Sequence, residues 1–562
     1  MGTITEKLMY YFRRITQDGV LAIGLLVSVF FLFAFVIYPL LNILATSFSP
    51  KALPLFGYLL GQGETQKVIL NTLWIGVAVA TIGTCLGFLM AYLQVRVDIP
   101  MKKVFHIVAI IPIISPPFAV AMSTITLFGR SGLITKQLLG IRYDIYGADG
   151  MIFALTISFI PFAYLSLLGM LKALDPAMDE AASDMGASGF RIFRNITLPL
   201  LVPGFASAFL LLFVSAIADL GNPLLLGGNM TVLASRIYLA IVGEYNLEAG
   251  AVLSIFLLMP SLLIFFVQHY WISRHSFTTV TGNPTGRIRL ITTPWVKALF
   301  FAGALLFSAV ILLVYGNIFF GALTKVWGIN LTPTLEHFRF VLLGYGFEAM
   351  KDTIVLAAAA TPLASLMGLL IAFLINRREF PGRSLIDFSS VLGLAVPGTI
   401  VGIALILTYN TPLLGGLVPK LTGTAFIIVM AFTVRSIPAA VRSGSAAMKQ
   451  IHKSMEEASK GLGASSATTF KRITIPLIRP AVFAGLVWAF ARSMTSLSPI
   501  IFLVTPEWRI MTAQILNEAE TGRFGNAAAY SVVLIFIVLS AIGFLRFTAG
   551  GSTGAERGMV GS

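Results

Sequence analysis

The chain has 562 residues, of which 57% are hydrophobic and only 11% are charged. A composition this apolar excludes an ordinary soluble globular protein and favours a chain that crosses a membrane several times. The formal net charge of +15 then indicates basic cytoplasmic loops facing anionic lipid headgroups rather than nucleic acid. A single cysteine, Cys85, excludes a disulfide framework and a thiolate metal cluster.

Apolar runs long enough to span a membrane follow one another along the chain in two sets of six. The first run follows a polar, basic start; it is too long for a signal peptide and lacks a small-residue cleavage site. We therefore predict an all-α integral membrane protein with about twelve transmembrane helices. The runs lie near residues 20–47, 68–95, 104–128, 150–171, 198–218, 249–271, 298–320, 352–375, 384–408, 424–445, 475–497 and 528–547.

These two sets predict the domain organisation. The first half is expected at 1–272 and the second at 298–548, joined by a basic cytoplasmic linker at 273–297. Residues 549–562, rich in glycine and serine, are expected to form a flexible tail. Counting basic residues in the loops predicts that the N- and C-termini of this multi-pass protein are both cytoplasmic.

One polar island interrupts each half, at about 170–204 and 447–481, and the two islands align without a gap. Self-similarity at this separation indicates a duplicated membrane unit. Asp175 or Ser454 is the expected helix N-cap, and a glycine further on offers a left-handed turn. Each island is therefore predicted to be a helix–turn–helix with a small-residue face. A solvated helical loop is the alternative, and the repetition disfavours it.

The island pattern resembles the EAA loop of bacterial ABC importer permeases. The first copy carries Glu180, Ala181, Ala182 and Gly186, followed by Ile196-x-Leu198-Pro199. The resemblance implies a type I ABC importer fold over about 65–272 and 346–548, in which each loop forms a coupling helix that docks on an ATP-binding subunit. The second copy departs at its third position, where the residue is serine but still small, and carries Glu457, Ala458, Ser459 and Gly463.

The repeat extends into the apolar helices. Gly87 matches Gly368, and in the next helix the Pro116-Pro117 pair aligns with Pro397-Gly398. Small residues allow close helix crossings, and mid-helix prolines are tolerated where neighbours satisfy the freed backbone. Two halves related by an axis along the membrane normal are expected to enclose a central path.

Polar residues after the fifth helix of each half, and one in the helix before the second island, are candidates for lining that path. Ionisable groups at membrane depth are costly and therefore point to function. The alternative is that the charged members are interfacial or structurally paired. The candidates are Asp219, Asn222, Arg435, Arg492, Ser496 and Ser498.

The sequence contains no Walker A, GxSxG, HExxH or Rossmann pattern, and its five histidines are scattered. We therefore expect no enzyme activity, no catalytic residue, no metal site and no cofactor bound by this chain. The resemblance implies that ATP and Mg are used by a homodimeric ABC subunit on the cytoplasmic side. It also implies a periplasmic or lipid-anchored substrate-binding protein on the outer side.

A fused two-half permease with the segment Asp219-Leu-Gly-Asn-Pro and a later Leu-Gly-Gly resembles ferric-iron permeases of the FbpB type. The resemblance implies ferric iron as cargo, with a phosphonate, sugar phosphate, thiamine or polyamine as alternatives. An ion-coupled secondary transporter would explain the duplication but not the paired islands. A structural membrane protein would explain neither.

Overall fold

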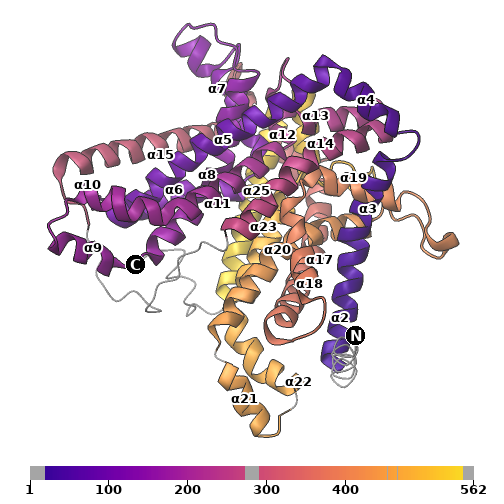
Figure 1. The fold of residues 1–562 in the computed structure, drawn as a ribbon. Coiled ribbons are helices and arrows are strands. Elements are labelled where there is room, and N and C mark those ends of the chain that lie inside the picture. The colour runs from indigo at the N-terminus through magenta and orange to yellow at the C-terminus, as the bar shows by residue number, and fades with distance from the viewer. Residues whose placement is uncertain (1–18, 273–289, 452, 465, 549–562) are drawn as a thin grey trace. The chain divides into compact units, whose positions relative to one another are not determined.

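The computed structural model describes residues 19–272, 290–451, 453–464 and 466–548, and these are helical almost throughout (Figure 1). Among them, ten helices are long and apolar enough to cross a membrane, or twelve if two bent helix pairs each count as one span. The predicted all-α membrane fold is confirmed. The predicted tail at 549–562 and the linker up to residue 289 lie outside the described residues.

Two compact units make up the described chain. Unit 1 comprises residues 19–49, 345–514 and 534–548, whereas unit 2 comprises the described parts of 50–344 and residues 515–533. The helices of unit 1 are α2 (Gly19–Leu32), α3 (Tyr38–Ser47), α17 (Phe347–Arg377), α18 (Arg383–Ala395), α19 (Gly398–Tyr409), α20 (Ala425–Gln450), α21 (Lys453–Gly461), α22 (Ser466–Thr469) and α23 (Ile475–Thr495).

Unit 2 holds most of the first half of the sequence. A short antiparallel hairpin, β1 (Thr324–Val326) with β2 (Asn330–Pro333), follows its last long helix. Two helices, α24 (Met511–Glu520) and α25 (Phe524–Thr548), have residues in both units. The helices of unit 2 are α4 (Leu53–Gly61), α5 (Gly63–Arg96), α6 (Lys102–Ile110), α7 (Pro117–Phe128), α8 (Ala148–Ala173), α9 (Pro176–Asp184), α10 (Gly189–Ile192), α11 (Leu198–Ile217), α12 (Gly221–Leu226), α13 (Leu233–Tyr238), α14 (Leu247–Phe266), α15 (Pro294–Ala322) and α16 (Glu336–Leu343).

The first long helix of the chain packs on helices of the second half. Asn42 Nδ2 donates to Thr408 Oγ1 at 3.2 Å, and the Tyr409 hydroxyl donates to the Ala34 carbonyl at 2.6 Å. The Phe35 ring lies 5.9 Å from the Tyr409 ring, centroid to centroid. The start of the chain therefore completes unit 1, whose other helices come from the second half.

The first helix of the second half, α15, packs reciprocally on helices of the first half in unit 2. Ser123 Oγ donates to the Val314 carbonyl at 2.8 Å, and Asn317 Nδ2 donates to Thr126 Oγ1 at 2.8 Å. Trp327 Nε1, from the hairpin, donates to Asn317 Oδ1 at 3.1 Å. Each unit thus takes its peripheral helix from the other half of the sequence.

Matching glycines set the main helix crossing of each unit. A Cβ at Gly87 of α5 would lie 2.9 Å from Ala163 Cβ of α8. A Cβ at Gly368 of α17 would lie only 2.3 Å from Ala440 Cβ of α20. Because even a methyl group does not fit, the backbones approach each other in the manner typical of membrane helices with small residues at their crossings.

The third apolar run of each half is not one straight helix, contrary to the predicted spans 104–128 and 384–408. In the first half, α6 ends at Ile110, and α7 begins only at Pro117. In the second half, α18 and α19 meet at an angle of 110°. Both breaks fall at the paired prolines and glycine seen in the sequence, because proline removes a helix hydrogen bond and restricts the residue before it.

Candidate functional site

The first island is a short helix, a turn and a second helix at one end of the long helices of unit 2 (Figure 1). Asp175 caps α9 as predicted, since its Oδ1 accepts from the Ala177 amide at 3.0 Å. The helix ends at Asp184, and the turn that follows passes through Gly186, whose φ of +84° explains the glycine. The Ala187 amide donates to the Ala182 carbonyl at 3.0 Å and closes the turn.

The second island repeats this geometry in unit 1. Gly463 has a φ of +81°, and the Ala464 amide donates to the Ser459 carbonyl at 3.1 Å. Ser454 does not take the cap position predicted for it, because α21 already begins at Lys453. The two loops therefore share one turn structure although their sequences differ at most positions.

The α9 helix has an inner and an outer face. Pro176, Asp179 and Ala182 are buried at a spacing of three residues, which places them on one side of the helix. Glu180 and Ala181 are exposed on the other side. The third position of the EAA pattern therefore faces its own chain in the first loop. In the second loop, Glu457 and Ala458 are exposed, whereas the Ser459 hydroxyl contacts Thr469 Oγ1 at 2.9 Å.

Exposed apolar side chains flank both turns, and the sequence reasoning missed them. Met178 and Met455 occupy the same position in the two copies and are 47% and 46% exposed. Met185 and Leu462 also match, at 84% and 90% exposed. The available signal was an apolar residue at the same register in two otherwise polar islands. Large apolar side chains repeated on an exposed surface favour contact with another protein.

Aromatic rings hold the first island against the long helices. A π-helical turn, Phe193–Thr197, joins α10 to α11. The Phe193 ring lies 5.4 Å from the Tyr92 ring and 6.3 Å from the Phe88 ring of α5, and Phe88 lies 4.7 Å from Phe205 of α11. A π-helical turn stands at the same register in the second copy, at Phe470–Thr474. Such turns are often found at functional sites.

Two connecting segments, 218–232 after α11 and 496–510 after α23, carry most of the predicted path residues. Asp219 Oδ2 accepts from the Asn222 amide at 2.9 Å and from Asn222 Nδ2 at 3.0 Å, and both residues are buried. Asp219 therefore orders the first turn of α12, which supports its structural reading.

The two connecting segments are held alike by the start of the first core helix of their unit. In unit 2, the Leu233 amide donates to Thr72 Oγ1 at 2.8 Å. In unit 1, the Met511 amide donates to Thr353 Oγ1 at 2.8 Å, and Asp352 Oδ2 accepts from the Arg509 amide at 3.0 Å. The duplication therefore extends to the hydrogen bonds made by Thr72 and Thr353.

The remaining path candidates lie in unit 1. Arg435 Nη1 donates to the carbonyls of Gly393 and Val396 at 2.8 and 2.9 Å, and so satisfies the open end of α18 where the helix breaks. Arg492 is partly exposed in the last turn of α23. The Ser496 carbonyl accepts from Thr512 Oγ1 at 3.0 Å. Ser498 packs at the start of α19, where a Cβ at Gly398 would lie 3.1 Å from Ser498 Cβ.

Replacing Asp219 with asparagine is expected to leave transport at limiting substrate unchanged, because the remaining side-chain oxygen can still accept the Asn222 amide. Asp219→Ala should instead lower the stability of the protein in detergent by roughly 1 kcal/mol, as loss of a helix cap does. Thermal unfolding and uptake of the two variants separate these effects. An uptake loss of about tenfold in Asp219→Asn with unchanged unfolding would show that the carboxylate meets cargo.

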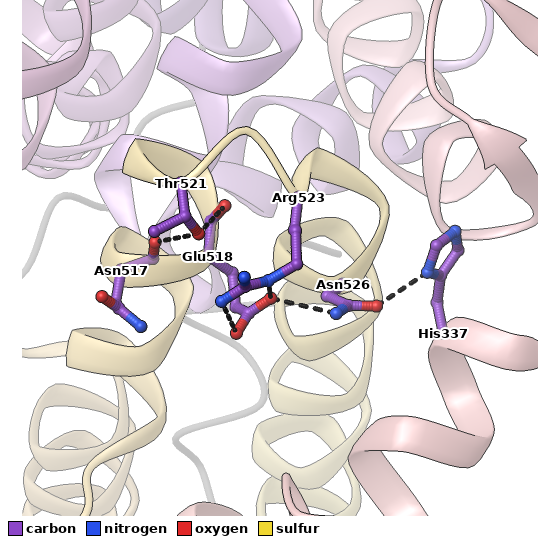
Figure 2. A network of polar contacts seen from close by, with 6 residues as sticks. All are labelled: His337, Asn517, Glu518, Thr521, Arg523 and Asn526. Atoms are coloured by element: carbon purple, nitrogen blue, oxygen red, sulfur yellow. Dashed lines mark hydrogen bonds and ion pairs between the residues drawn. The ribbon is translucent and has the colours of Figure 1, made fainter.

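A polar network joins the turn between α24 and α25 to α16 within unit 2 (Figure 2). The buried Glu518 carboxylate accepts from Arg523 Nε at 2.7 Å, Arg523 Nη2 at 3.0 Å and Asn526 Nδ2 at 2.9 Å. Asn526 Oδ1 lies 2.7 Å from His337 Nδ1, and His337 Nε2 lies 3.0 Å from the Thr324 carbonyl. The hydrogen bond to Glu518 raises the pKa of the Arg523 guanidinium.

Glu518→Gln is expected to lower the unfolding temperature, because an amide nitrogen would face the donors of Arg523 or Asn526. Arg523 is half-exposed, so solvent screens its part of the loss, and the partly buried hydrogen bond between Asn526 and Glu518 accounts for about 1 kcal/mol. Thermal unfolding of the purified protein measures it. Glu520→Gln is the matched control, since it makes the same change at an exposed position of the same helix. Equal unfolding temperatures for both variants would contradict the prediction.

The part of the chain described by the structure contains no group of three or more His, Cys, Asp or Glu side chains placed to hold a metal ion. The same residues form two sets of membrane-spanning helices, two exposed loops of similar structure and two similar connecting segments. These features define a duplicated multi-pass permease. The chain belongs to the family described as the binding-protein-dependent transport system inner membrane component, whose sequence profile matches residues 83–278 and 362–549.

Relatives match over most of the chain. The ferric transport system permease protein FbpB of Actinobacillus pleuropneumoniae is 34% identical over 98% of this chain and 82% of its own length. A putative ferric transport system permease protein of Haemophilus influenzae, FbpB 1, is 33% identical over 88% of this chain and 79% of its own length. The sulfate transport system permease protein CysT of Salmonella typhimurium is 27% identical but covers 34% of this chain and 72% of its own length.

The chain is therefore an ABC importer permease of the bacterial inner membrane, a translocation subunit and not an enzyme. This assignment sets aside the ion-coupled secondary transporter and the structural membrane protein. The same relatives confirm the predicted resemblance to fused two-half permeases.

Proposed function

We propose that this chain is the permease of an ATP-driven importer whose cargo is ferric iron. The assignment of ferric iron as the cargo rests on the similarity, across both halves, to relatives named as ferric transport permeases. The relative named for sulfate matches only 34% of this chain. A phosphonate, sugar phosphate, thiamine or polyamine would use the same mechanism, and each is an outcome of the uptake experiment below.

The exposed loops support docking of an ATP-binding subunit. Glu180 and Glu457 are each followed by an exposed alanine and, five residues later in the chain, by an exposed apolar side chain, Met185 or Leu462. Two alike surfaces fit a partner made of two identical subunits, which would use ATP and Mg itself. Gly186 and Gly463 form the turns directly after the docking helices, next to the exposed apolar side chains. With the ATP-binding subunit docked there, both loops would face the cytoplasm, and so would both termini under the predicted topology.

The opposite side of the membrane then faces a periplasmic or lipid-anchored binding protein, which delivers the cargo. The connecting segments 218–232 and 496–510 stand at that end of the core helices, since they are held by Thr72 and Thr353. Asn222, Ser496 and Ser498 lie on or beside these segments. Their polar groups are candidates for lining the path, and so is Arg492 at the end of α23.

Uptake by proteoliposomes tests the proposal. Vesicles would contain this chain with its ATPase and binding protein, and would be offered radioactive ferric iron, a phosphonate and a sugar phosphate in turn. We expect iron accumulation that requires ATP hydrolysis and disappears with an ATPase that binds but cannot hydrolyse ATP. ATP-dependent uptake of another cargo would overturn the iron assignment and keep the mechanism. Uptake that persists without ATP would overturn both.

A further inference from the structure

Two arginines end the first core helix of each half at matching positions. Arg96 is the last residue of α5 and Arg377 the last residue of α17. Both bond to the chain at or just before the following island, as described below. The family pattern that identifies the loops includes neither residue.

Arg96 forms a buried ion pair with the first loop. Its Nη1 donates to Asp179 Oδ2, and the two residues are 7% and 6% exposed. Asp179 lies on the inner face of α9, directly before the exposed Glu180. Because a buried charge is costly without its partner, this pair ties α9 to α5 far more firmly than a surface pair could.

Arg377 binds the chain just before the helix of the second loop. Its Nη2 donates to the Met448 carbonyl at 2.8 Å and to the Ile451 carbonyl at 2.9 Å. These carbonyls belong to the end of α20, two residues before α21 begins at Lys453. Charged donors on open helix carbonyls make strong, directional contacts. The end of α17 is therefore fixed by hydrogen bonds to the end of α20. The second loop is attached to this end of α20.

The other ends of the same two helices hold the connecting segments. Asn71 of α5 donates to the Thr231 carbonyl at 3.1 Å, and Asp352 of α17 accepts from the Arg509 amide at 3.0 Å. The adjacent Thr72 and Thr353 accept from the amides of Leu233 and Met511, which directly follow the two segments. From Thr72 to Arg96 the helix rise amounts to about 36 Å, most of the thickness of a bilayer. Each core helix is thus fixed to an island at one end and to a connecting segment at the other.

We propose that α5 and α17 are the elements that transmit loop movement across the membrane, with Arg96–Asp179 and Arg377 as the positioning links at their island ends. This rests on the proposed coupling role of the loops. When the ATPase displaces the outer face of α9, the ion pair carries the displacement to α5, and α5 moves the 218–232 segment. The links touch neither ATP nor cargo.

A fluorescence experiment tests the link without any cargo. Cys85 is the only cysteine, so a Cys85→Ala background takes one label at Asn229→Cys, an exposed site in the first connecting segment. In the complex with its ATPase, the label should change its emission when ATP binds. We expect Asp179→Asn and Arg96→Gln to remove most of this change while the ATPase still binds, and to lower transport per ATP hydrolysed about tenfold.

Exchanging the two charged residues shows whether the ion pair transmits movement or only stabilises the fold. The double variant Arg96→Asp with Asp179→Arg should recover most of the ATP-dependent emission change. The matched control is Asp98→Asn, which breaks the exposed pair with Lys297 two residues beyond Arg96 and should behave as wild type. If Arg96→Gln fails to accumulate, Asp179→Asn and the exchange variant carry the test.

The outcomes distinguish this inference from the proposed function. A wild-type complex whose label responds to ATP, with an unchanged response in Asp179→Asn, overturns the link and leaves the permease assignment intact. A wild-type chain that does not bind the ATPase overturns the docking proposal itself. Loss of response in Asp179→Asn with recovery in the exchange variant supports the link whichever cargo is transported.

Discussion

Replacing Glu180 and Glu457 together by arginine is expected to abolish ATP-dependent uptake while the protein still inserts and purifies normally. Both side chains are exposed on the outer faces of α9 and α21, so their replacement leaves the packing of the long helices intact. At the docking surface, however, two carboxylates become two guanidinium groups. Reversed charge at an interface produces like-charge repulsion and prevents correct association.

Co-purification of the ATPase with the membrane protein measures this effect directly, and uptake follows it. The control reverses two exposed carboxylates elsewhere, one in each unit, by Glu64→Arg with Glu507→Arg. This control should retain the ATPase. Normal recruitment of the ATPase and normal uptake by the Glu180→Arg, Glu457→Arg protein would contradict the proposed coupling role of the loops. Met185→Ser with Leu462→Ser should weaken recruitment without any change of charge, since it removes exposed apolar area.

The second large effect is expected at the glycine crossings. Gly368→Leu should prevent accumulation of folded protein, because the Cβ alone would lie 2.3 Å from Ala440 Cβ and 3.1 Å from the Val441 amide nitrogen. Backbone atoms cannot move aside as a flexible side chain can. Even Gly368→Ala should cost about 1–3 kcal/mol of stability, the usual cost of overpacking.

Size-exclusion profiles and thermal unfolding in detergent measure this loss, with Gly87→Ala as the parallel change in unit 2. The matched controls are Gly169→Ala in α8 and Gly543→Ala in α25, where a new Cβ would meet nothing within 4 Å. Those changes should be neutral or slightly stabilising, because alanine favours helix more than glycine does. Equal unfolding temperatures for Gly368→Ala and the controls would show that the crossing can relax.

Local chemistry explains what could be read from the sequence. The islands were found because Glu180, Gly186 and Pro199 have matching partners in the second half, and the predicted glycine turns at Gly186 and Gly463 are present with positive φ. The Asp175 cap is present too, because a cap depends only on its neighbours along the chain. The crossing at Gly87 and Gly368 was likewise visible as a repeated small residue.

Contacts distant in sequence could not be predicted. Nothing in the apolar stretch around Asn42 indicates that its partner is Thr408, because lipid-facing and protein-facing apolar residues read alike. Arg435 reads equally well as a path residue or a helix cap until Gly393 and Val396 are placed beside it. The roles of the predicted docking and path residues remain proposals, since they concern partners and cargo.

The exchange of peripheral helices between the halves has a consequence for biosynthesis. The helix around Asn42 enters the membrane early, but the residues that pack on it, Thr408 and Tyr409, are made more than 360 residues later: 366 residues separate Asn42 from Thr408, and 375 separate Ala34 from Tyr409. At ordinary translation rates this delay is roughly 20–70 s. During that time a polar asparagine side chain waits in lipid without its native acceptor. Because unit 1 also includes residues 534–548, it cannot be completed before the ribosome has nearly finished. A chain truncated before Thr408 leaves its first helix open to capture by other membrane proteins.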